Sequence, residues 1–138
     1  MVTLVDSSVW IDFLRDRDTP QTDRLIRLLR STKILTADLV LTEVLQGVRD
    51  ERAHDRALEL LSLPGILSVS SAEVAIQAAR NYRHLRGRGI TIRKTIDTLI
   101  ATRCILDGIP LLYADRDYDP FVQHLGLRSA MDLPTGAE

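Results

Sequence analysis

Four acidic residues of this 138-residue chain lie in or directly after apolar segments: Asp6, Glu43, Asp97 and Asp115. A carboxylate in such a setting costs free energy unless a positive charge compensates it. If the fold gathers the four acids, their repulsion raises their pKa values and destabilises the protein unless a cation screens them. Oxygen ligands select Mg²⁺ or Mn²⁺ over zinc. The four acids therefore indicate a divalent-cation site assembled from distant parts of the chain.

Asp97 is the strongest of the four candidates. The helix predicted over residues 95–106 places Ala101 and Cys104 one and two turns further along the face of Asp97. This acid is therefore not part of a polar stripe. A carboxylate is also favoured near a helix N-terminus for structural reasons, which weakens the case for a functional Asp97. Its position on an apolar face still favours a functional role.

Asp6 and Asp115 each have a structural alternative. Asp6 follows the apolar residues 2–5 and could cap the next helix, although Ser7 and Ser8 are natural N-cap residues for that helix as well. The Ser8 hydroxyl could instead support a metal-bound water. Asp115 opens an acidic turn that could simply cap the last helix.

Glu43 lies in a helix predicted over residues 38–48, with Asp38 as its cap. An exposed glutamate is the ordinary interpretation, because Glu43 flanks the apolar stripe. Gly47 stands one turn further on, inside the predicted helix. A glycine inside a helix costs about 1 kcal/mol relative to alanine, so it suggests a close approach by another group.

Short apolar segments alternate with helical ones along the chain. We predict strands at 2–5, 33–36, 66–69 and 110–113, and helices at 9–14, 21–30, 38–48, 52–61, 72–85, 95–106 and 118–124. This alternation predicts an α/β fold with a mainly parallel sheet covered on both faces. Ligands bind at the carboxyl ends of such strands, so Asp6 and Asp115 are expected on the same edge.

Composition limits the class of protein. With 45% hydrophobic residues, the chain is expected to form one domain over residues 1–138. No apolar run approaches the ~18 residues of a membrane span, and no signal peptide is recognisable. Cys104 is the single cysteine, which excludes an internal disulfide and fits a reducing compartment, so we predict a cytoplasmic protein. We expect Cys104 in the core, and surface positions for the three histidines, which lack paired ligand spacing: His54, His84 and His124.

A net charge of −1, from 18 Lys+Arg and 19 Asp+Glu, argues against a protein that coats nucleic acid through a global positive field. It leaves room for a local basic groove. Four positive charges precede the Asp97 helix: Arg86, Arg88, Arg93 and Lys94. They could form a solvated loop, but their nearness to Asp97 favours contact with a phosphate backbone.

Four segments together resemble the PIN domain, and more closely the VapC toxins of prokaryotic type II toxin–antitoxin systems. They read Leu-Val-Asp-Ser-Ser-Val-Trp-Ile (4–11), Leu-Thr-Glu-Val-Leu-Gln-Gly (41–47), Ile-Asp-Thr-Leu-Ile-Ala (96–101) and Leu-Tyr-Ala-Asp-Arg-Asp (112–117). The resemblance spans residues 2 to about 121. Tyr113 and Ala114 replace the usual threonine-rich pair, a departure that leaves the acids intact.

This resemblance implies a three-layer α/β/α sandwich and a Mg²⁺- or Mn²⁺-dependent endoribonuclease. It also implies a homodimer, neutralised by a cognate antitoxin whose tail enters the active-site groove. By motif position the acidic quartet corresponds to Asp6, Glu43, Asp97 and Asp115, with Asp117 as an auxiliary acid.

The implied reaction is hydrolysis of an RNA phosphodiester. Asp6 and Asp97 would be the principal metal ligands, with Asp115 bound directly or through water. Glu43 would hold a second ion or orient the attacking water. The metal would lower the pKa of that water and neutralise charge in the transition state.

Two other functions remain open. A phosphatase of the haloacid dehalogenase type also begins with an aspartate after a strand, but it needs a second aspartate where this chain has Ser8. A catalytically inactive PIN-like module that binds RNA or a partner would not need the intact quartet. A calorimetric magnesium titration separates these readings, because absence of heat favours the binding module.

Overall fold

A parallel sheet of four strands organises the computed structural model, which describes residues 2–134. The strands are β1 (Val2–Val5), β2 (Lys33–Ala37), β3 (Ile66–Leu67) and β4 (Leu111–Leu112), in the order β3-β2-β1-β4. Leu4 of β1 pairs in register with Leu35 of β2 and Leu111 of β4. β1 is therefore a central strand, and its carboxyl end lies between those of β2 and β4.

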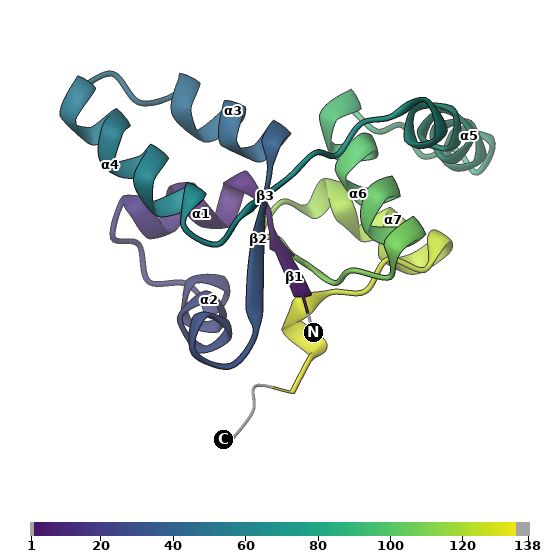
Figure 1. Ribbon diagram of the computed structural model, residues 1–138. Helices are drawn as coiled ribbons and strands as arrows, with labels where there is room; N and C mark the ends of the chain where they lie inside the picture. Colours follow the sequence, from purple (N-terminus) through teal and green to yellow (C-terminus); the bar gives the residue numbers. More distant parts are fainter. Residues whose placement is uncertain (1, 135–138) are drawn as a thin grey trace.

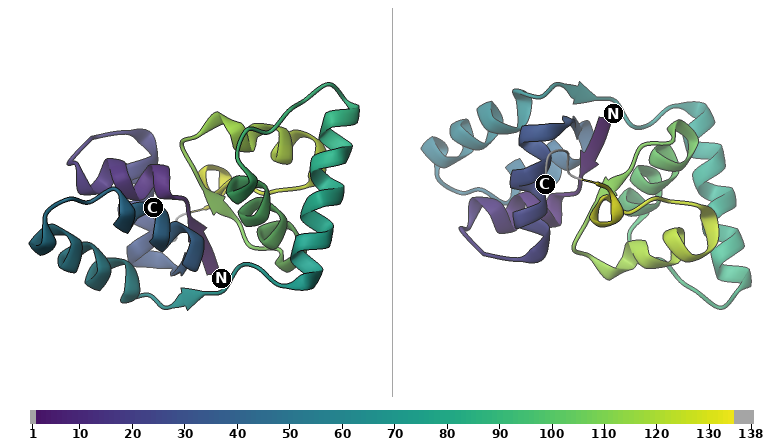
Figure 2. Two further views of the ribbon diagram at one scale, coloured as in Figure 1. Left: turned by 90° about the horizontal axis from the view of Figure 1, so that it is seen from above. Right: turned by 90° about the horizontal axis from the view of Figure 1, so that it is seen from below.

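Helices cover both faces of the sheet (Figures 1 and 2). One layer contains α1 (Ser7–Leu14), α2 (Pro20–Ser31), α3 (Asp38–Gln46) and α4 (Glu51–Ser62). The other contains α5 (Ala72–Gly87), α6 (Thr95–Asp107) and α7 (Asp119–Leu125). Two short 3₁₀ turns complete the described chain, η1 (Arg116–Tyr118) and η2 (Ala130–Asp132). The predicted α/β/α sandwich is confirmed.

The core lies where both helical layers meet the sheet. Leu4 and Val5 of β1 are fully buried, as parallel strands covered on both faces must be. Trp10 and Phe121 are the large apolar side chains buried on the two sides. These residues belong to one continuous apolar cluster, which holds the ends of β1 and β4 in place.

The structure decides between the alternatives that the sequence left open for the cap of α1. Neither serine caps the helix, because Asp6 is the N-cap and its carboxylate accepts a hydrogen bond from the backbone N–H of Ser8. Asp38 is likewise not a cap, since Ala37 holds that position in α3. The Asp38 carboxylate instead accepts from the backbone N–H groups of Leu39 and Val69.

The prediction for Gly47 was wrong. α3 ends at Gln46, and Gly47 is its C-cap rather than an interior residue. An added Cβ would meet nothing nearer than a backbone oxygen at 3.6 Å, which is ordinary contact. Gly47 has φ of −85° and ψ of −8°, which other residues also adopt, and no group approaches it closely, so neither its backbone nor its surroundings require glycine.

Other ends of strands and helices differ from the prediction by a few residues. β3 and β4 have two residues each rather than four, and the N–H of Val69 bonds to Asp38 instead of a strand. α5 continues to Gly87, and the left-handed residue after it is Gly89, with φ of +80°. Tyr118 ends η1 instead of beginning α7.

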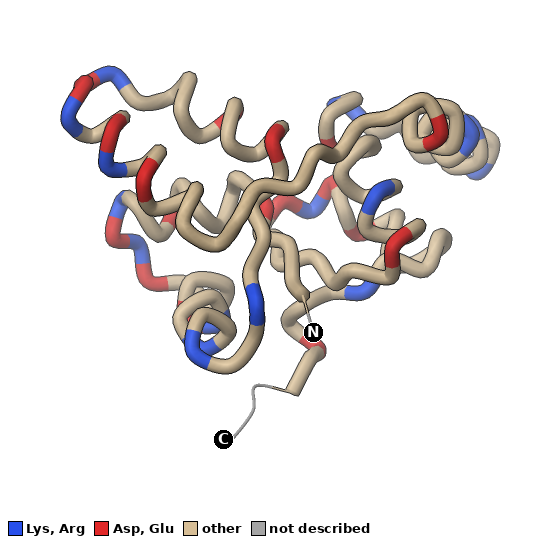
Figure 3. The backbone as a smooth tube through the Cα atoms, viewed as in Figure 1, with Lys and Arg blue, Asp and Glu red and all other residues tan. Residues whose placement is uncertain are grey.

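Charges of both signs are mixed along the surface helix α4. Acidic and basic residues alternate along α4 (Figure 3), in keeping with the small net charge. Among the described residues, no helix has both the length and the apolar character needed to cross a bilayer.

Candidate metal centre and active site

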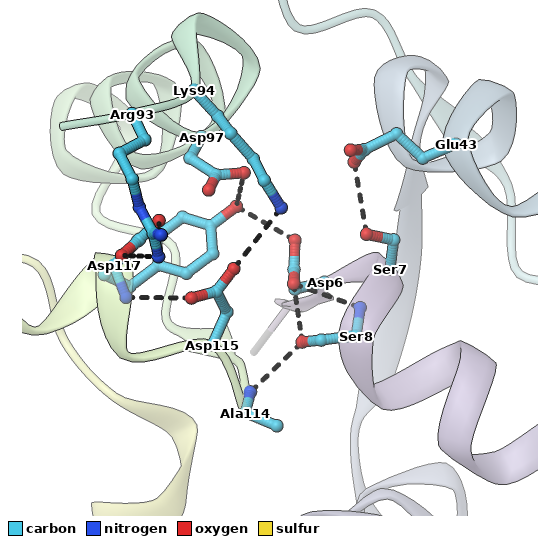
Figure 4. Close-up of polar contacts among 11 residues, drawn as sticks. Asp6, Ser7, Ser8, Glu43, Arg93, Lys94, Asp97, Ala114, Asp115 and Asp117 are labelled. Carbon is cyan, nitrogen blue, oxygen red and sulfur yellow. Dashed lines mark hydrogen bonds and ion pairs between the residues drawn. The ribbon is translucent and has the colours of Figure 1, made fainter.

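The predicted acids meet at the carboxyl edge of the sheet. Asp6 directly follows β1, Asp115 follows β4, and Asp97 lies in the first turn of α6. Figure 4 shows these three carboxylates facing a common space, with Glu43 approaching from α3 in the opposite helical layer. The parallel sheet produces this convergence, because it brings the carboxyl ends of β1 and β4 side by side.

Three acids form the tightest group. Asp97, Asp115 and Asp117 each offer a carboxylate oxygen, and these oxygens all lie within 4.8 Å of one another. Asp115 is held in place by the backbone N–H of Asp117, which donates to its Oδ1 at 2.9 Å. This spacing lets three carboxylates share one small cation, as Mg²⁺ and Mn²⁺ sites require.

Asp6 is both a helix cap and a member of the acidic cluster. Its Oδ2 accepts from the backbone N–H and hydroxyl of Ser8, at 3.1 and 2.6 Å. The Ser8 hydroxyl in turn accepts from the backbone N–H of Ala114 at 3.2 Å. Ser8 thus ties the residue after β1 to the loop after β4 and orients Asp6 through direct hydrogen bonds.

The Asp97 carboxylate is buried, and one of its two oxygens lacks a hydrogen-bond partner among the described residues. Its side chain is 3% exposed, and its Oδ2 has no hydrogen-bond partner within the described part of the chain. Burial, followed by the charge of Asp6, raises its pKa to about 7, although the charge of Lys94 opposes the rise. An orphaned carboxylate oxygen beside Asp115 and Asp117 is the environment in which a bound cation supplies the missing partner. The residues present therefore fit a divalent metal.

Glu43 faces the cluster from the other layer. The side chain is half-buried, and its Oε1 accepts a hydrogen bond from the Ser7 hydroxyl at 3.1 Å. Burial raises its pKa, and the charge of Asp6 raises it further. The negative charge of the cluster therefore raises the pKa of Glu43, although the oxygens of Glu43 are not in the group formed by Asp97, Asp115 and Asp117.

Two of the four predicted basic residues border the acids. Lys94 Nζ lies 3.6 Å from Asp115 Oδ2, and Arg93 pairs with Asp117 at 3.3 Å. The pKa of Lys94 is raised, chiefly by the charge of Asp97. A pair of cations thus stands at the exposed border of the cluster.

Arg86 and Arg88 lie elsewhere, at the end of α5. The Arg86 guanidinium lies 5.7 Å from the ring centre of Tyr82, and Arg88 donates to His84. No described contact joins either arginine to the acidic cluster. Their role in RNA binding stays a prediction.

Tyr118 is the site residue that sequence reasoning missed. Its hydroxyl lies 2.9 Å from Asp6 Oδ1 and 3.3 Å from Asp97 Oδ1, and the side chain is fully buried. Burial, and then the charges of Asp6 and Asp97, raise the pKa of its phenol well above the ordinary value. The sequence signal was the tyrosine three residues after Asp115, because a buried tyrosine usually places its hydroxyl against a polar partner.

The remaining candidate ligands lie away from this site. Cys104 is buried as predicted, and burial raises the pKa of its thiol to about 12. His84 and His124 are exposed as expected. His54 is half-buried and groups with Glu51 and Asp55 on the surface of α4, but these exposed acids have no buried, unsatisfied oxygen, so we infer no metal there.

The sequence places this chain in a known family. The family model of the PIN domain matches residues 3–121, so the chain belongs to the PIN domain family. Two curated relatives are each 29% identical over 129 residues, covering 92% of this chain and 96% of their own length. They are VapC ribonuclease Mb1587 of Mycobacterium bovis and ribonuclease VapC11 of Mycobacterium tuberculosis.

Solved structures share the same fold. VapBC2 from Rickettsia felis, bound to a promoter DNA fragment, superposes with a TM-score of 0.73 at 17% identity, covering 94% of this chain and 97% of that one. VapBC-1 from nontypeable Haemophilus influenzae gives 0.71 at 17% identity, covering 94% and 98%. Mycobacterium tuberculosis VapC20, a toxin that cleaves the sarcin–ricin loop, gives 0.64 at 21% identity, covering 86% and 93%.

Proposed function

We propose that this protein is a divalent-metal-dependent endoribonuclease and the toxin of a type II toxin–antitoxin system. The observation that carries the proposal is the buried carboxylate of Asp97, whose Oδ2 lacks a partner beside Asp115 and Asp117. Membership of the PIN domain family and the names of the VapC relatives support the activity on RNA. The sequence resemblance to VapC toxins supports the same function.

The metal ligands in this proposal are Asp6, Asp97, Asp115 and Asp117. The oxygen-only donor set and the absence of nearby sulfur or imidazole ligands among the described residues support Mg²⁺ or Mn²⁺. When bound, such a cation lowers the pKa of a water and offsets charge on a phosphate undergoing displacement.

The chain's own side chains complete the chemistry. Glu43, whose pKa is raised, is suited to accept a proton from the attacking water or to orient that water. Arg93 and Lys94 stand at the exposed border of the acids, where they can hold the RNA phosphates. Asp6 is kept in position by Ser8, whose hydroxyl donates to its Oδ2.

The proposal includes partners and location. Two of the similar structures are toxin–antitoxin complexes, which supports a cognate antitoxin for this chain, and the VapC resemblance supports a homodimer. We place the protein in the cytoplasm, because its single thiol, Cys104, is buried and unpaired. One continuous core among residues 2–134 supports a single domain over 1–138.

Neither alternative function gains an observation in its favour. The position of the second phosphatase aspartate is Ser8, whose hydroxyl is already bonded to Asp6 and to the N–H of Ala114. A binding module without catalysis gives no reason for a buried, unsatisfied carboxylate at Asp97, because such a group costs stability.

Cleavage of end-labelled RNA tests the proposal. We expect internal cuts with Mn²⁺ or Mg²⁺, none with EDTA, and none with Asp97→Asn. Asp18→Asn is the matched control, because it removes the same charge from an exposed loop. Full cleavage by Asp97→Asn, or in EDTA, would contradict the assignment. Growth arrest on expression, relieved by a co-expressed antitoxin, tests the toxin role separately.

A further inference from the structure

A buried phenol joins two of the acids. Tyr118 is the last residue of η1, and its ring packs beside Tyr113 and Phe121 with ring centres 5.2 and 6.5 Å away. Its hydroxyl reaches Asp6 Oδ1 at 2.9 Å and Asp97 Oδ1 at 3.3 Å. Both carboxylates are buried, so the hydroxyl is a partner that water does not readily replace.

The Tyr118 hydroxyl contacts one oxygen of each carboxylate and leaves the other oxygen of each for a different partner. Asp6 Oδ1 faces Tyr118, whereas Oδ2 faces Ser8. Asp97 Oδ1 faces Tyr118, whereas Oδ2 has no partner among the described residues. The phenol therefore restrains the rotation of both carboxylates and leaves the second oxygen of Asp97 free for another partner.

Rigid placement is what a metal site needs from its surroundings. Groups that hydrogen-bond to metal ligands fix the orientation of those ligands, and their removal typically lowers metal affinity about 10- to 100-fold. Tyr118 is well suited to this task, because its ring is fully buried beside two aromatic neighbours and has little rotational freedom.

We propose that Tyr118 is a positioning residue for the metal centre: its hydroxyl sets the orientation of Asp6 and Asp97 so that their oxygens are arranged for a divalent cation before it arrives. This role rests on the proposed function, since it concerns the same cation. Part of the metal affinity then comes from the Tyr118 hydroxyl, which acts through Asp6 and Asp97 and need not touch the metal.

A neighbouring tyrosine provides a matched control. The Tyr113 ring packs against Tyr118, but its hydroxyl donates to Asp119 at 3.0 Å and to none of the clustered acids. Tyr113→Phe and Tyr118→Phe thus remove the same atom from the same aromatic stack. Only the second removes the single phenolic proton that Asp6 and Asp97 share, with the shorter contact to Asp6.

The test is a calorimetric Mn²⁺ titration of the wild type and both variants, with folding checked by thermal unfolding in EDTA. We expect the dissociation constant for Mn²⁺ to rise about 10- to 100-fold in Tyr118→Phe and to stay near wild type in Tyr113→Phe. The Mn²⁺ concentration for half-maximal cleavage should rise by the same factor, while the rate at saturating Mn²⁺ returns toward wild type. A purely structural role would lower the unfolding temperature without changing the affinity of the folded protein.

Three results overturn the proposal in distinguishable ways. Wild type and Tyr118→Phe binding Mn²⁺ equally well would remove the positioning role but leave the metal-dependent nuclease intact. A wild type that binds no Mn²⁺ would overturn the proposed metal centre and the role of Tyr118 with it. Equal weakening by Tyr113→Phe would also contradict the assignment, because the effect would then belong to the aromatic stack.

Discussion

Replacing Asp97 by asparagine should stabilise the metal-free protein while it abolishes activity. The side chain is 3% exposed and its Oδ2 lacks a partner among the described residues. Asparagine has nearly the same shape but no charge, so it can face Asp6 and Asp115 without repulsion. The change therefore isolates the electrostatic cost of the carboxylate.

The expected magnitude follows from the pKa of Asp97. Burial, and next the charge of Asp6, raise it from 3.8 to about 7. That difference corresponds to about 4 kcal/mol of free energy. Because the pKa is higher in the folded protein, the ionised carboxylate destabilises the fold; the cost is complete above about pH 7 and disappears as the pH falls toward 3.8. Burying the asparagine amide offsets part of the gain, so we expect about 2–4 kcal/mol near pH 8.

Urea unfolding in EDTA measures this effect. The difference in unfolding free energy between Asp97→Asn and wild type should be about 2–4 kcal/mol near pH 8 and should shrink steadily as the pH is lowered through about 5. Adding Mn²⁺ at about 100 times its dissociation constant should stabilise wild type by about 2.7 kcal/mol and leave the variant nearly unchanged. Asp18→Asn serves as control and should show no such pH dependence, because Asp18 is exposed.

Two results would refute the reasoning. An Asp97→Asn protein no more stable than wild type near pH 8 would mean that the carboxylate is compensated in the metal-free fold. A stability difference that does not change with pH would mean that packing, rather than charge, separates the two proteins.

Three further variants probe the residues around Asp97. Glu43→Gln should lower the cleavage rate by about 10²-fold or more, if Glu43 handles the proton of the attacking water; initial rates at saturating Mn²⁺ measure this, and a wild-type rate would contradict the role. Lys94→Gln should destabilise the metal-free protein by about 1 kcal/mol or less near pH 8, because Lys94 is exposed and faces Asp115. Asp97 raises the pKa of Lys94 above 10.5, so this contribution is present below that pH and is lost as the pH rises beyond it; urea unfolding that shows a stabilised variant would be the opposite outcome. Phe121→Ala should cost about 3–5 kcal/mol in the same assay, because Phe121 is fully buried beside Tyr118; a loss below about 1 kcal/mol would show that the core refills the space.

Local patterns predicted the elements well and their ends less well. The apolar residues of β1 and the apolar face around Asp97 are visible in the sequence, because burial there follows from short-range spacing. The end of α3 at Gly47 was misjudged, since a glycine near a helix end can be read as interior or terminal until the next turn is known. Asp38 was misassigned because its partner, Val69, lies on a distant segment.

The sequence by itself determined the order of strands and helices and the acids at the ends of apolar segments, because spacing and burial preference are properties of the local chain. A parallel sheet then requires the ends of β1 and β4 to share an edge, so the meeting of Asp6 with Asp115 was foreseeable. Only the tertiary structure decided how individual oxygens are used. Tyr118 and Asp6 are 112 positions apart, and their hydrogen bond exists because β1 pairs with β4 and η1 follows β4, which no local pattern encodes.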